Sequence, residues 1–410
     1  MDMVDTSKDI GKGMLEIYRK YDRVKIGGYI QPQLQVAEVK GAKSFIGGDF
    51  EPNSNNRFML RRGRLRIEYI HFAENKGPSI QFVFQFDGSE KGFFTRDFWG
   101  RLMENKYKLF SLTTGIFARP FSYELNLGSA DRESPERGRM SQILTKVERD
   151  LGAMISFEPR KKDHPLKHLK IDAGFFNGPG LNSTADFDSH KDFITRAGLK
   201  PYPLAKNILF STAISYFDGG LLQNTKYIYR TISASGGKIM AVDSALSNAG
   251  KIAPRKYYGV DAQLKFKHVA GSTELRAEYV FGTQPGTQNS SEPPATLLVG
   301  NSGYYIRKFN GAYFYILQNI FSPQHQLALK YDWYDANSEV KGSEIGQPGT
   351  NLNASNIRFN TLGLGYIYYA NENLKLLLWY DRVHNEKTQL PGFAADAKDD
   401  SFTARLQFRF

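Results

Sequence analysis

Hydrophobic and polar residues alternate along most of this chain with a period of two, the pattern of β-strands that have one apolar and one polar face. The alternating segments are about 9–16 residues long, and no apolar run reaches the roughly 20 residues that a membrane-spanning helix needs. The pattern predicts sixteen strands, near residues 24–38, 57–72, 79–87, 93–103, 107–118, 150–158, 168–177, 192–200, 207–218, 255–268, 272–283, 303–318, 325–336, 356–370, 374–386 and 401–410.

The connections between the predicted strands alternate between short and long. The seven short connections are 73–78, 104–106, 159–167, 201–206, 269–271, 319–324 and 371–373. The other eight are mostly long and polar, and include 39–56, 119–149, 219–254, 284–302, 337–355 and 387–400. In an up-and-down meander every second connection emerges at the same end. The predicted fold class is therefore all-β: a transmembrane antiparallel up-and-down β-barrel of about 16 strands, with short periplasmic turns and long extracellular loops.

The ends of the chain refine this prediction. Because the strand number is even, we expect both termini at the end with short turns. Residues 1–22 are predicted to form an N-terminal periplasmic arm, and residues 23–410 the barrel. The start, Met1 to Asp5, lacks the basic and apolar regions of a signal peptide, so we expect either a cytoplasmic protein or a chain whose leader was removed. Segment 225–233 is either an additional strand or a hairpin within a long loop.

The last ten residues alternate without a break and end on an aromatic residue. One face of this strand carries Phe402, Ala404, Leu406, Phe408 and Phe410. A soluble β-sandwich can end in such a strand. A final amphipathic strand that ends in Phe also resembles the C-terminal recognition strand of bacterial outer-membrane barrels, which implies contact of the Phe410 end with the barrel-assembly machinery.

Composition changes the picture in three respects. Of the 410 residues only 41% are hydrophobic, which suits a large barrel because half of its strand positions face water inside. The absence of cysteine excludes thiolate zinc sites, thiol catalysis and disulfide scaffolds. The 54 Lys and Arg against 42 Asp and Glu give a net charge of +12, which permits nucleic acid, an acidic membrane surface or small anions as partners.

The most basic predicted strand lies over residues 57–72. Its apolar residues from Leu65 onwards fix the outward face, so Arg62, Arg64 and Arg66 point into the lumen at intervals of roughly 6.6–6.8 Å. Arg61 shares the outward parity, where an arginine facing mid-membrane lipid costs about 2–4 kcal/mol. We therefore expect Arg61 near the outer interface or in a subunit contact.

Two functions are open for this column of arginines. Guanidinium groups match the geometry of phosphate and carboxylate, which makes the column a track for anions. Alternatively, acidic residues of an inserted loop cross the column and produce a transverse field without an anion preference. The first hypothesis is favoured by the other cations with inward parity, which are Lys25, Lys170, Arg196, Lys265, Lys267, Arg276, Lys330, Arg405 and Arg409.

Three segments resemble the phosphate-selective porin family, porins O and P. Residues 58–68 (FMLRRGRLRIE) are similar to its Phe-x-x-Arg-Arg-Ala-x-Leu-x-Phe strand, and residues 115–124 (GIFARPFSYE) to its Gly-x-Phe-x-x-Pro-Phe-Gly-x-Glu segment. Residues 361–372 (TLGLGYIYYANE) resemble its penultimate hairpin. The resemblance implies a trimeric sixteen-strand porin of the Gram-negative outer membrane, with an arginine ladder in the lumen and a third long loop folded inward as the constriction.

Segment 119–149 has the place and the length of that constriction loop. Its near-balance of charge differs from a strongly cationic constriction. The basic residues are Arg119, Arg132, Arg137, Arg139, Lys146 and Arg149, and the acidic residues include Asp131, Glu133, Glu136 and Glu148.

Other classes of function lack comparable motifs. A hydrolase needs a nucleophile near a positioned histidine, but the seven histidines are scattered. His164 and His168 flank Pro165, which favours a solvated turn over a metal site. The acidic clusters at 186–188 and 396–400 are candidate calcium sites, although such groups more often solvate a loop. Basic and aromatic residues interleave along every strand rather than on one patch, which argues against nucleic-acid binding.

We therefore expect an outer-membrane porin, not an enzyme, that allows passive diffusion of small hydrophilic solutes and favours phosphate or other small anions. We expect no cofactor. The expected partners are two further copies in a homotrimer, outer-membrane lipid and lipopolysaccharide, and small anionic solutes. Two alternatives stay open: a non-conducting structural barrel that binds partners as an assembly component, and an outer-membrane hydrolase.

Overall fold

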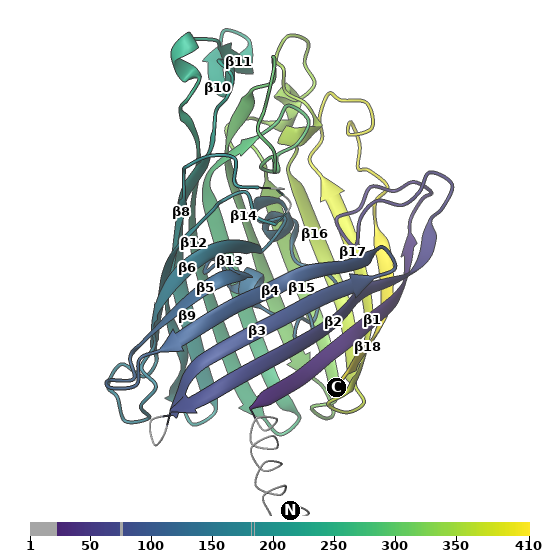
Figure 1. Ribbon diagram of the computed structural model, residues 1–410. Coiled ribbons are helices and arrows are strands. Elements are labelled where there is room, and N and C mark those ends of the chain that lie inside the picture. The colour runs from purple at the N-terminus through teal and green to yellow at the C-terminus, as the bar shows by residue number, and fades with distance from the viewer. Residues whose placement is uncertain (1–22, 74–76, 182, 184) are drawn as a thin grey trace, which may run out of the picture.

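Sixteen of the alternating segments pair with their neighbours in chain order, and the last pairs with the first, so that the sheet closes into a barrel (Figure 1). The computed structural model describes residues 23–73, 77–181, 183 and 185–410, so the predicted arm 1–22 lies outside the described residues. Two further strands form a hairpin in one extracellular loop. The predicted all-β barrel of sixteen strands is confirmed.

The barrel strands follow the predicted ranges closely. They are β1 (Val24–Ala37), β2 (Asn56–Ala73), β3 (Gly77–Ser89), β4 (Gly92–Met103), β5 (Phe110–Ala118), β6 (Arg149–Phe157), β7 (Leu169–Phe176), β8 (Asp192–Ala205), β9 (Ile208–Leu222), β12 (Ile252–His268), β13 (Gly271–Gly286), β14 (Tyr304–Asn319), β15 (His325–Asp335), β16 (Phe359–Tyr369), β17 (Leu374–Asn385) and β18 (Ser401–Arg409).

The remaining elements lie in the connections. They are the loop strands β10 (Ile228–Ala234) and β11 (Gly237–Asp243), the short helices α2 (Tyr123–Asn126) and α3 (Arg139–Leu144), and the 3₁₀ turns η1 (Leu246–Asn248), η2 (Gly342–Glu344) and η3 (Ala354–Asn356). No helix of the described residues is long and apolar enough to cross a membrane.

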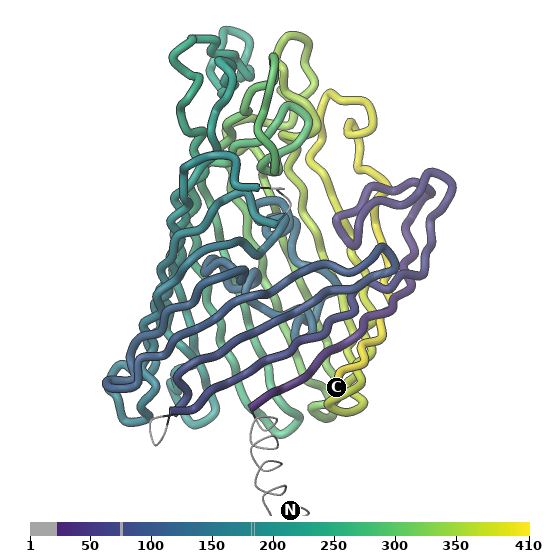
Figure 2. The backbone as a smooth tube through the Cα atoms, in the orientation of Figure 1, coloured from purple at the N-terminus to yellow at the C-terminus, as the bar shows by residue number. Residues whose placement is uncertain are grey.

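Closure brings the first and last strands together at the end with short turns. In the register, Ile30 of β1 lies opposite both Gly63 of β2 and Phe408 of β18. The backbones of Gly28 and Phe410 exchange two hydrogen bonds of 3.1 Å each. Figure 2 shows the start of β1 and the C-terminus at the same end, with the large loops at the opposite end. The predicted segregation of short turns from long loops is therefore confirmed.

Two connections differ from the prediction. β8 continues to Ala205, so the turn predicted at 201–206 shrinks to two residues before β9. Pro201 and Pro203 favoured a turn because proline donates no backbone hydrogen bond, but the pairing of β8 with β9 is irregular there and tolerates them. Segment 225–233 belongs to the β10–β11 hairpin, and β10 also pairs in parallel with the start of β14, where the rings of Tyr229 and Tyr305 stack 4.1 Å apart.

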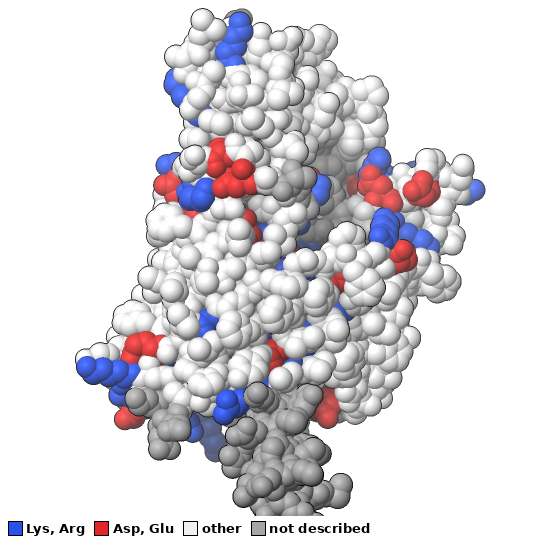
Figure 3. All heavy atoms as spheres, viewed as in Figure 1, with Lys and Arg blue, Asp and Glu red and all other residues white. Residues whose placement is uncertain are grey.

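The outer face of the barrel is apolar, as alternation predicts for a lipid-facing surface. Its exposed side chains include Ile26, Phe84, Leu112 and Ile214. Figure 3 shows that the face over β1–β4 carries mainly uncharged atoms, whereas lysine, arginine and acidic side chains gather above and below it. An apolar band between two polar ends fits the hydrocarbon core of a membrane.

A β-bulge in β2 changes the parity of the most basic strand. In the pairing with β1, Gln31 alone faces two consecutive residues, Arg61 and Arg62. The extra residue directs both arginines inward and restores an outward position for Phe58, which is 85% exposed. The expectation that Arg61 lies at the outer interface or in a subunit contact is wrong, because counting alternate residues assumes an unbroken strand.

A second bulge acts on β4 in the same way. Gln85 of β3 pairs with Asp97, but the next residue, Phe86, pairs with Thr95, which leaves Arg96 as the extra residue. Arg96 consequently reaches a carboxylate inside the barrel, at 3.4 Å from Glu148. Each of the two bulges thus turns one additional arginine toward the lumen.

Segment 119–148, which contains α2 and α3, lies inside the barrel (Figure 1). Its apolar residues Phe121, Leu125, Met140 and Ile143 are buried against one side of the barrel wall. That wall contributes Phe117, Met154, Phe176, Ile194, Phe217, Tyr257, Val280, Phe309 and Tyr334. The main hydrophobic core therefore sits within the barrel, and the inner face is polar mainly on the side that this core leaves uncovered.

Candidate functional site

The inserted segment divides the barrel interior into an outer and an inner space. The outer cavity has a volume of about 1090 Å³ and is bordered by extracellular loops. On the periplasmic side lie the inner cavity, about 560 Å³, and the lysine cavity, about 610 Å³. The inner and lysine cavities share Lys170, Asp172 and Arg196, so they adjoin, and Arg64 borders both the outer and the inner cavity.

One carboxylate of the inserted segment holds three arginines of the wall. Glu136 lies 2.8 Å from Arg61, 2.6 Å from Arg62 and 3.1 Å from Arg405. Its side chain is only 4% exposed. Burial acts to raise the pKa of Glu136, but the three guanidinium groups hold that pKa well below its usual value. Glu136 is therefore an ionised anchor between the inserted segment, β2 and β18.

Two other acidic residues of the segment also meet basic residues of the wall. Glu133 accepts two hydrogen bonds from Arg276, at 2.7 and 3.0 Å. Asp131 lies 3.3 Å from Arg409 at the periplasmic side. Lys375 adds a bond to the backbone, because its Nζ donates to the carbonyl oxygen of Ala130 at 2.6 Å. The balance of charge noted in the segment thus serves to attach it to the wall.

A network of alternating charges separates the outer cavity from the inner cavity. Arg64 donates to Asp87 at 2.9 Å, and Arg96 lies 3.7 Å from Asp87 and 3.4 Å from Glu148. Glu148 also pairs with Arg137 and, at 3.6 Å, with Arg149. Burial acts to raise the pKa of Glu148, but Arg137, Arg96 and Arg149 hold it well below its usual value. The boundary between the two cavities is therefore formed by side chains of both signs of charge.

Arg64 also contacts the inserted segment directly. Its Nη1 donates to the hydroxyl of Tyr29 at 2.7 Å and to Ser129 Oγ at 2.8 Å. Tyr29 and Ser129 are themselves 2.6 Å apart. These bonds join β1, β2 and the inserted segment at Arg64.

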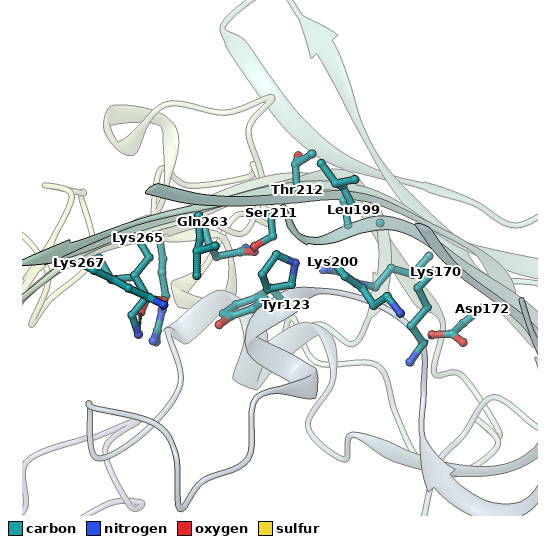
Figure 4. A pocket seen from close by; sticks show the side chains of 17 residues that line it. Tyr123, Lys170, Asp172, Leu199, Lys200, Ser211, Thr212, Gln263, Lys265 and Lys267 are labelled. Carbon is teal, nitrogen blue, oxygen red and sulfur yellow. Dashed lines mark hydrogen bonds and ion pairs between the residues drawn. The ribbon is translucent and has the colours of Figure 1, made fainter. Parts of the chain in front are cut away.

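The lysine cavity has a different character. Its basic residues are spread along β7, β8, β12 and β13, and Figure 4 shows four labelled lysines around the ring of Tyr123. Only two acidic residues, Asp172 and Glu274, border it, with Glu158 reaching Lys170 and Lys200 from beside it. The basic residues are Lys170, Arg196, Lys200, Lys265, Lys267 and Arg276.

The structure brings most of the predicted lumen cations to these three cavities. Arg62 and Arg64 border the outer cavity, and Arg64 and Arg66 border the inner cavity. Arg66 pairs with its neighbour Glu68 at 3.1 Å. Lys25 is exposed at the start of β1, where the register places it opposite Glu68. The predicted residues at the lysine cavity are Lys170, Arg196, Lys265, Lys267 and Arg276.

Besides Lys25, two predicted lumen cations lie away from these cavities. Lys330 is 2% exposed and pairs with Asp332 at 2.9 Å behind α3, and Arg405 is equally buried against Glu136 and Gln33. Both have inward parity, but the inserted segment covers them. Placing them on the solute path was wrong for this reason. Strand parity predicts that a side chain points inward, but it does not predict whether another segment covers that side chain.

The four arginines predicted at the constriction have separate roles. Arg119 is buried at the base of the inserted segment, where it donates to the carbonyl oxygen of Gly178. Arg132 is 3% exposed and borders none of the three cavities. Arg137 and Arg139 both border the outer cavity. All four belong to the inserted segment, but only Arg137 and Arg139 reach one of these three cavities, because Arg119 and Arg132 are buried within the protein.

Sequence reasoning missed several residues of the interior. Simple alternation from Phe98 directs Arg96 outward, and only the bulge in β4 reverses this. Lys200 shares the parity of Arg196, which was a usable signal. Phe45, in the loop after β1, and Phe359, at the start of β16, both border the outer cavity beside Arg139, and nothing in the sequence indicates that they meet.

The candidate metal sites have partners within the protein. Asp186 pairs with Lys191 at 2.6 Å, and Asp396 pairs with His384 at 2.8 Å. Asp400 accepts a hydrogen bond from the hydroxyl of Tyr380 at 2.6 Å. Among the residues that the structure describes, no group of three or more histidine and acidic side chains has the arrangement of a metal site.

A closed sixteen-strand barrel with an apolar outer face and a segment folded into its interior defines an outer-membrane channel protein. The sequence matches the model of the family described as phosphate-selective porin O and P over residues 79–410. The chain belongs to this family and is a porin of the Gram-negative outer membrane, as the sequence motifs predicted. A search of curated protein sequences finds no match.

Solved porin structures share the fold at low sequence identity. OprB of Pseudomonas putida superposes with a TM-score of 0.59 at 10% identity, covering 98% of this chain and 97% of OprB. An anion-selective porin from Comamonas acidovorans gives a TM-score of 0.56 at 12% identity, covering 94% of this chain and 99% of that porin. The channel DcaP of Acinetobacter baumannii gives a TM-score of 0.54 at 14% identity, covering 94% of this chain and 97% of DcaP. These similarities establish the barrel fold.

Proposed function

We propose that this porin allows passive diffusion of small hydrophilic solutes and favours anions, including phosphate. The observation that carries the proposal is that basic residues outnumber acidic ones around all three interior cavities. The outer cavity is bordered by nine basic and six acidic residues, the inner cavity by seven and three, and the lysine cavity by six and two. Such an excess raises the local concentration of anions.

The ratio of basic to acidic residues is highest in the lysine cavity, where the cations are also least neutralised. The three arginines near Glu136 are all paired with it, and Arg62 and Arg405 are also buried, so they contribute little net field to a passing solute. In the lysine cavity, Lys170 and Lys265 keep about two fifths of their side-chain surface exposed, at 41% and 42%. Exposed pairs are weak because water screens them, so these lysines remain available to anions. We infer that anion preference arises mainly on the periplasmic side.

The mixed network at Arg64, Asp87, Arg96 and Glu148 sets the narrowest part of the proposed path. Its opposed charges orient a hydrated solute by a transverse field, and the absence of a strongly cationic ring keeps binding weak enough for exit. The alternative of a track formed by the whole arginine column is less favoured, because each of its members is paired: Arg62 with Glu136, Arg64 with Asp87 and Arg66 with Glu68.

The exposed outer face over β2–β4 supports the proposal of a homotrimer. Phe58 of β2 and Phe93 of β4 are 85% and 84% exposed near the extracellular ends of strands that end lower than those on the opposite side of the barrel in Figure 1. A low, aromatic wall is suited to burial against a second copy. We propose outer-membrane lipid and lipopolysaccharide as the surroundings of the remaining outer face, barrel-assembly machinery as the partner of the Phe410 end, and no cofactor.

Planar-bilayer recording of the purified protein tests the channel proposal. In a tenfold gradient of potassium chloride, the reversal potential is expected to show a preference for chloride over potassium. A preference for potassium contradicts the anion proposal. A complete absence of conductance favours instead the alternative of a structural barrel that binds partners.

A further inference from the structure

Arg139 differs from the other arginines that border the outer cavity. Arg61, Arg62, Arg64, Arg96 and Arg137 each lie within 4.0 Å of a carboxylate. The guanidinium of Arg139 takes part in no ion pair or hydrogen bond among the described residues, although its side chain is buried and the residue is only 8% exposed. It is therefore a cation whose donors are not used by the described protein.

Two aromatic rings hold this guanidinium. Its Cζ lies 3.7 Å from the ring centre of Phe359 and 4.4 Å from that of Phe45. Stacking on aromatic faces stabilises a guanidinium and keeps it flat, while the N–H groups at its edge remain directed away from the rings. The rings thus fix the orientation of Arg139 without consuming its hydrogen-bonding capacity.

Three separate parts of the chain build this arrangement. The loop after β1 carries Phe45, and Gln35 fixes that loop by donating to the carbonyl oxygen of Ile46 at 2.8 Å. At the start of α3, the backbone N–H of Gly138 donates to both carboxylate oxygens of Glu124 at 3.0 Å. Because β16 supplies Phe359 from the rigid wall, the three groups are held in place before any ligand arrives.

The surroundings of Arg139 in the outer cavity are apolar on one side and charged on the other. Phe393 packs edge-on against Phe359, with ring centres 6.4 Å apart, and Ile143 and Tyr334 border the same space. Asp332 is occupied by Lys330 at 2.9 Å. Asp399 borders the cavity but is not within ion-pair distance of Arg139.

We propose that Arg139, stacked between Phe45 and Phe359, binds the carboxylate of a small organic anion that has an apolar body. The carboxylate pairs with the free edge of the guanidinium, whose fork matches its two oxygens. The apolar body rests against Phe393, Ile143 and Tyr334. This site rests on the proposed anion permeation. It adds a preference for carboxylates with an apolar body over inorganic phosphate.

Burial lowers the pKa of Arg139 to about 10, so the guanidinium stays charged at neutral pH. Binding of a carboxylate therefore needs no proton transfer. The ligand enters from the extracellular side, because the loop after β1 and segment 386–400 both border the cavity. Capture at this position precedes the mixed network at Arg64, and so acts on solutes before they pass the narrowing.

Benzoate, acetate and inorganic phosphate are the probes, since benzoate adds an apolar body to the carboxylate that acetate has. Isothermal titration calorimetry on the purified protein in detergent is expected to show benzoate binding about tenfold more tightly than acetate or phosphate. Arg139→Gln is expected to weaken benzoate binding about tenfold, the effect of losing a charge-assisted pair. Phe45→Leu keeps the charge and is expected to weaken benzoate binding about threefold, with little effect on acetate.

Arg358→Gln is the matched control, because Arg358 precedes Phe359 at the same height but does not border the cavity. It is expected to leave benzoate binding unchanged within twofold. Equal binding of benzoate by the Arg139→Gln and wild-type proteins overturns the inference, and so does equal binding of benzoate and phosphate by the wild-type protein. Calorimetry does not depend on conduction, so a cation-selective or closed channel contradicts the proposed function without deciding this site.

Discussion

The arginines held by Glu136 and the lysines of the periplasmic cavity lie on the same inner face and carry the same charge, but their surroundings differ. Arg62 and Arg405 keep 8% and 3% of their side-chain surface exposed and share one buried carboxylate. Lys265 keeps 42% exposed, and its pair with Glu274 is open to water. Buried charges are held by their partners, whereas half-exposed charges act on the solution. The first group therefore fixes the inserted segment, and the second provides the field.

The largest expected effect comes from removing the shared carboxylate. In Glu136→Gln, three arginines lose their common partner while two of them, Arg62 and Arg405, stay buried, which costs about 3–5 kcal/mol for a broken buried pair. We expect a lower temperature of heat-induced unfolding, measured by the change in electrophoretic mobility of samples heated in detergent. We also expect larger current fluctuations, because the inserted segment is less firmly attached.

Glu292→Gln is the control for this experiment, since Glu292 pairs with Lys146, which is 60% exposed. An exposed pair contributes only about 0–1 kcal/mol, so this variant is expected to unfold close to the wild-type temperature. Equal shifts for the two variants contradict the assignment of Glu136 as the anchor.

The second effect concerns selectivity and separates the two groups of cations directly. Replacing Lys170, Lys200, Lys265 and Lys267 together with glutamine is expected to lower the chloride-over-potassium permeability ratio by about threefold to tenfold, because the local excess of anions falls. Arg62→Gln is expected to lower the unfolding temperature but to leave this permeability ratio close to that of the wild type. Reversal potentials in planar bilayers measure both variants.

A control with the same change in net charge replaces four exposed extracellular lysines, Lys251, Lys308, Lys341 and Lys387, with glutamine. Its permeability ratio is expected to stay near that of the wild type. If Arg62→Gln lowers anion preference as strongly as the four inner substitutions do, the paired arginines contribute to the field and the comparison fails.

A smaller effect is expected from ionic strength. The Debye length falls from about 10 Å at 0.1 M to about 3 Å at 1 M salt, so distant and exposed charges are screened. Anion preference that arises from the lysine cavity is therefore expected to weaken over this range, as recorded by reversal potentials at constant gradient. The unfolding temperature is expected to change little, because the Glu136 cluster is buried. A salt-independent preference points instead to a buried selectivity element.

The smallest effect is expected from pH and concerns the outer cavity. Burial raises the pKa of Asp399 to about 6, with Arg139 acting in the opposite direction and Asp396 and Asp400 adding to the rise. As the pH falls through 6, Asp399 gains a proton, so the outer cavity loses a negative charge and anion preference is expected to increase slightly. Reversal potentials at pH 7.5 and 5 measure this change.

The same group has a defined effect on stability. Because the folded carboxyl binds its proton more readily than the unfolded one, the cost of its ionisation is present in full above pH 6 and is relieved as the pH falls toward 4. Asp399→Asn is expected to remove both pH effects. If anion preference and stability still depend on pH in this variant, another titratable group is responsible.

Much of the barrel follows from local sequence. Ile26 and Ile30 face lipid and Gln31 and Gln33 face inward because backbone geometry alternates side chains along any extended strand. The bulge at Arg61 and Arg62 could not be predicted in this way. A bulge is a property of two paired strands, in which two residues of one strand lie opposite one residue of the other. The alternation within a single strand does not reveal it.

The candidate site was predictable only in part. The inward direction of Arg62, Arg64 and Lys265 follows from parity, and the place of segment 119–149 from the order of the loops. The covering of Lys330 and Arg405 does not, because it depends on how that segment folds inside the barrel. The meeting of Phe45, Arg139 and Phe359 depends on three segments that are distant in the chain.

The sequence by itself therefore determined the strand number, the ends at which short and long connections emerge, and the face on which most charges lie. These features depend on a period of two and on connection length, which are local. Only the tertiary structure decided which inward charges are neutralised. A charge acts on the solution according to its burial and its nearest partner, and for Arg62 that partner, Glu136, lies 74 residues away in the chain.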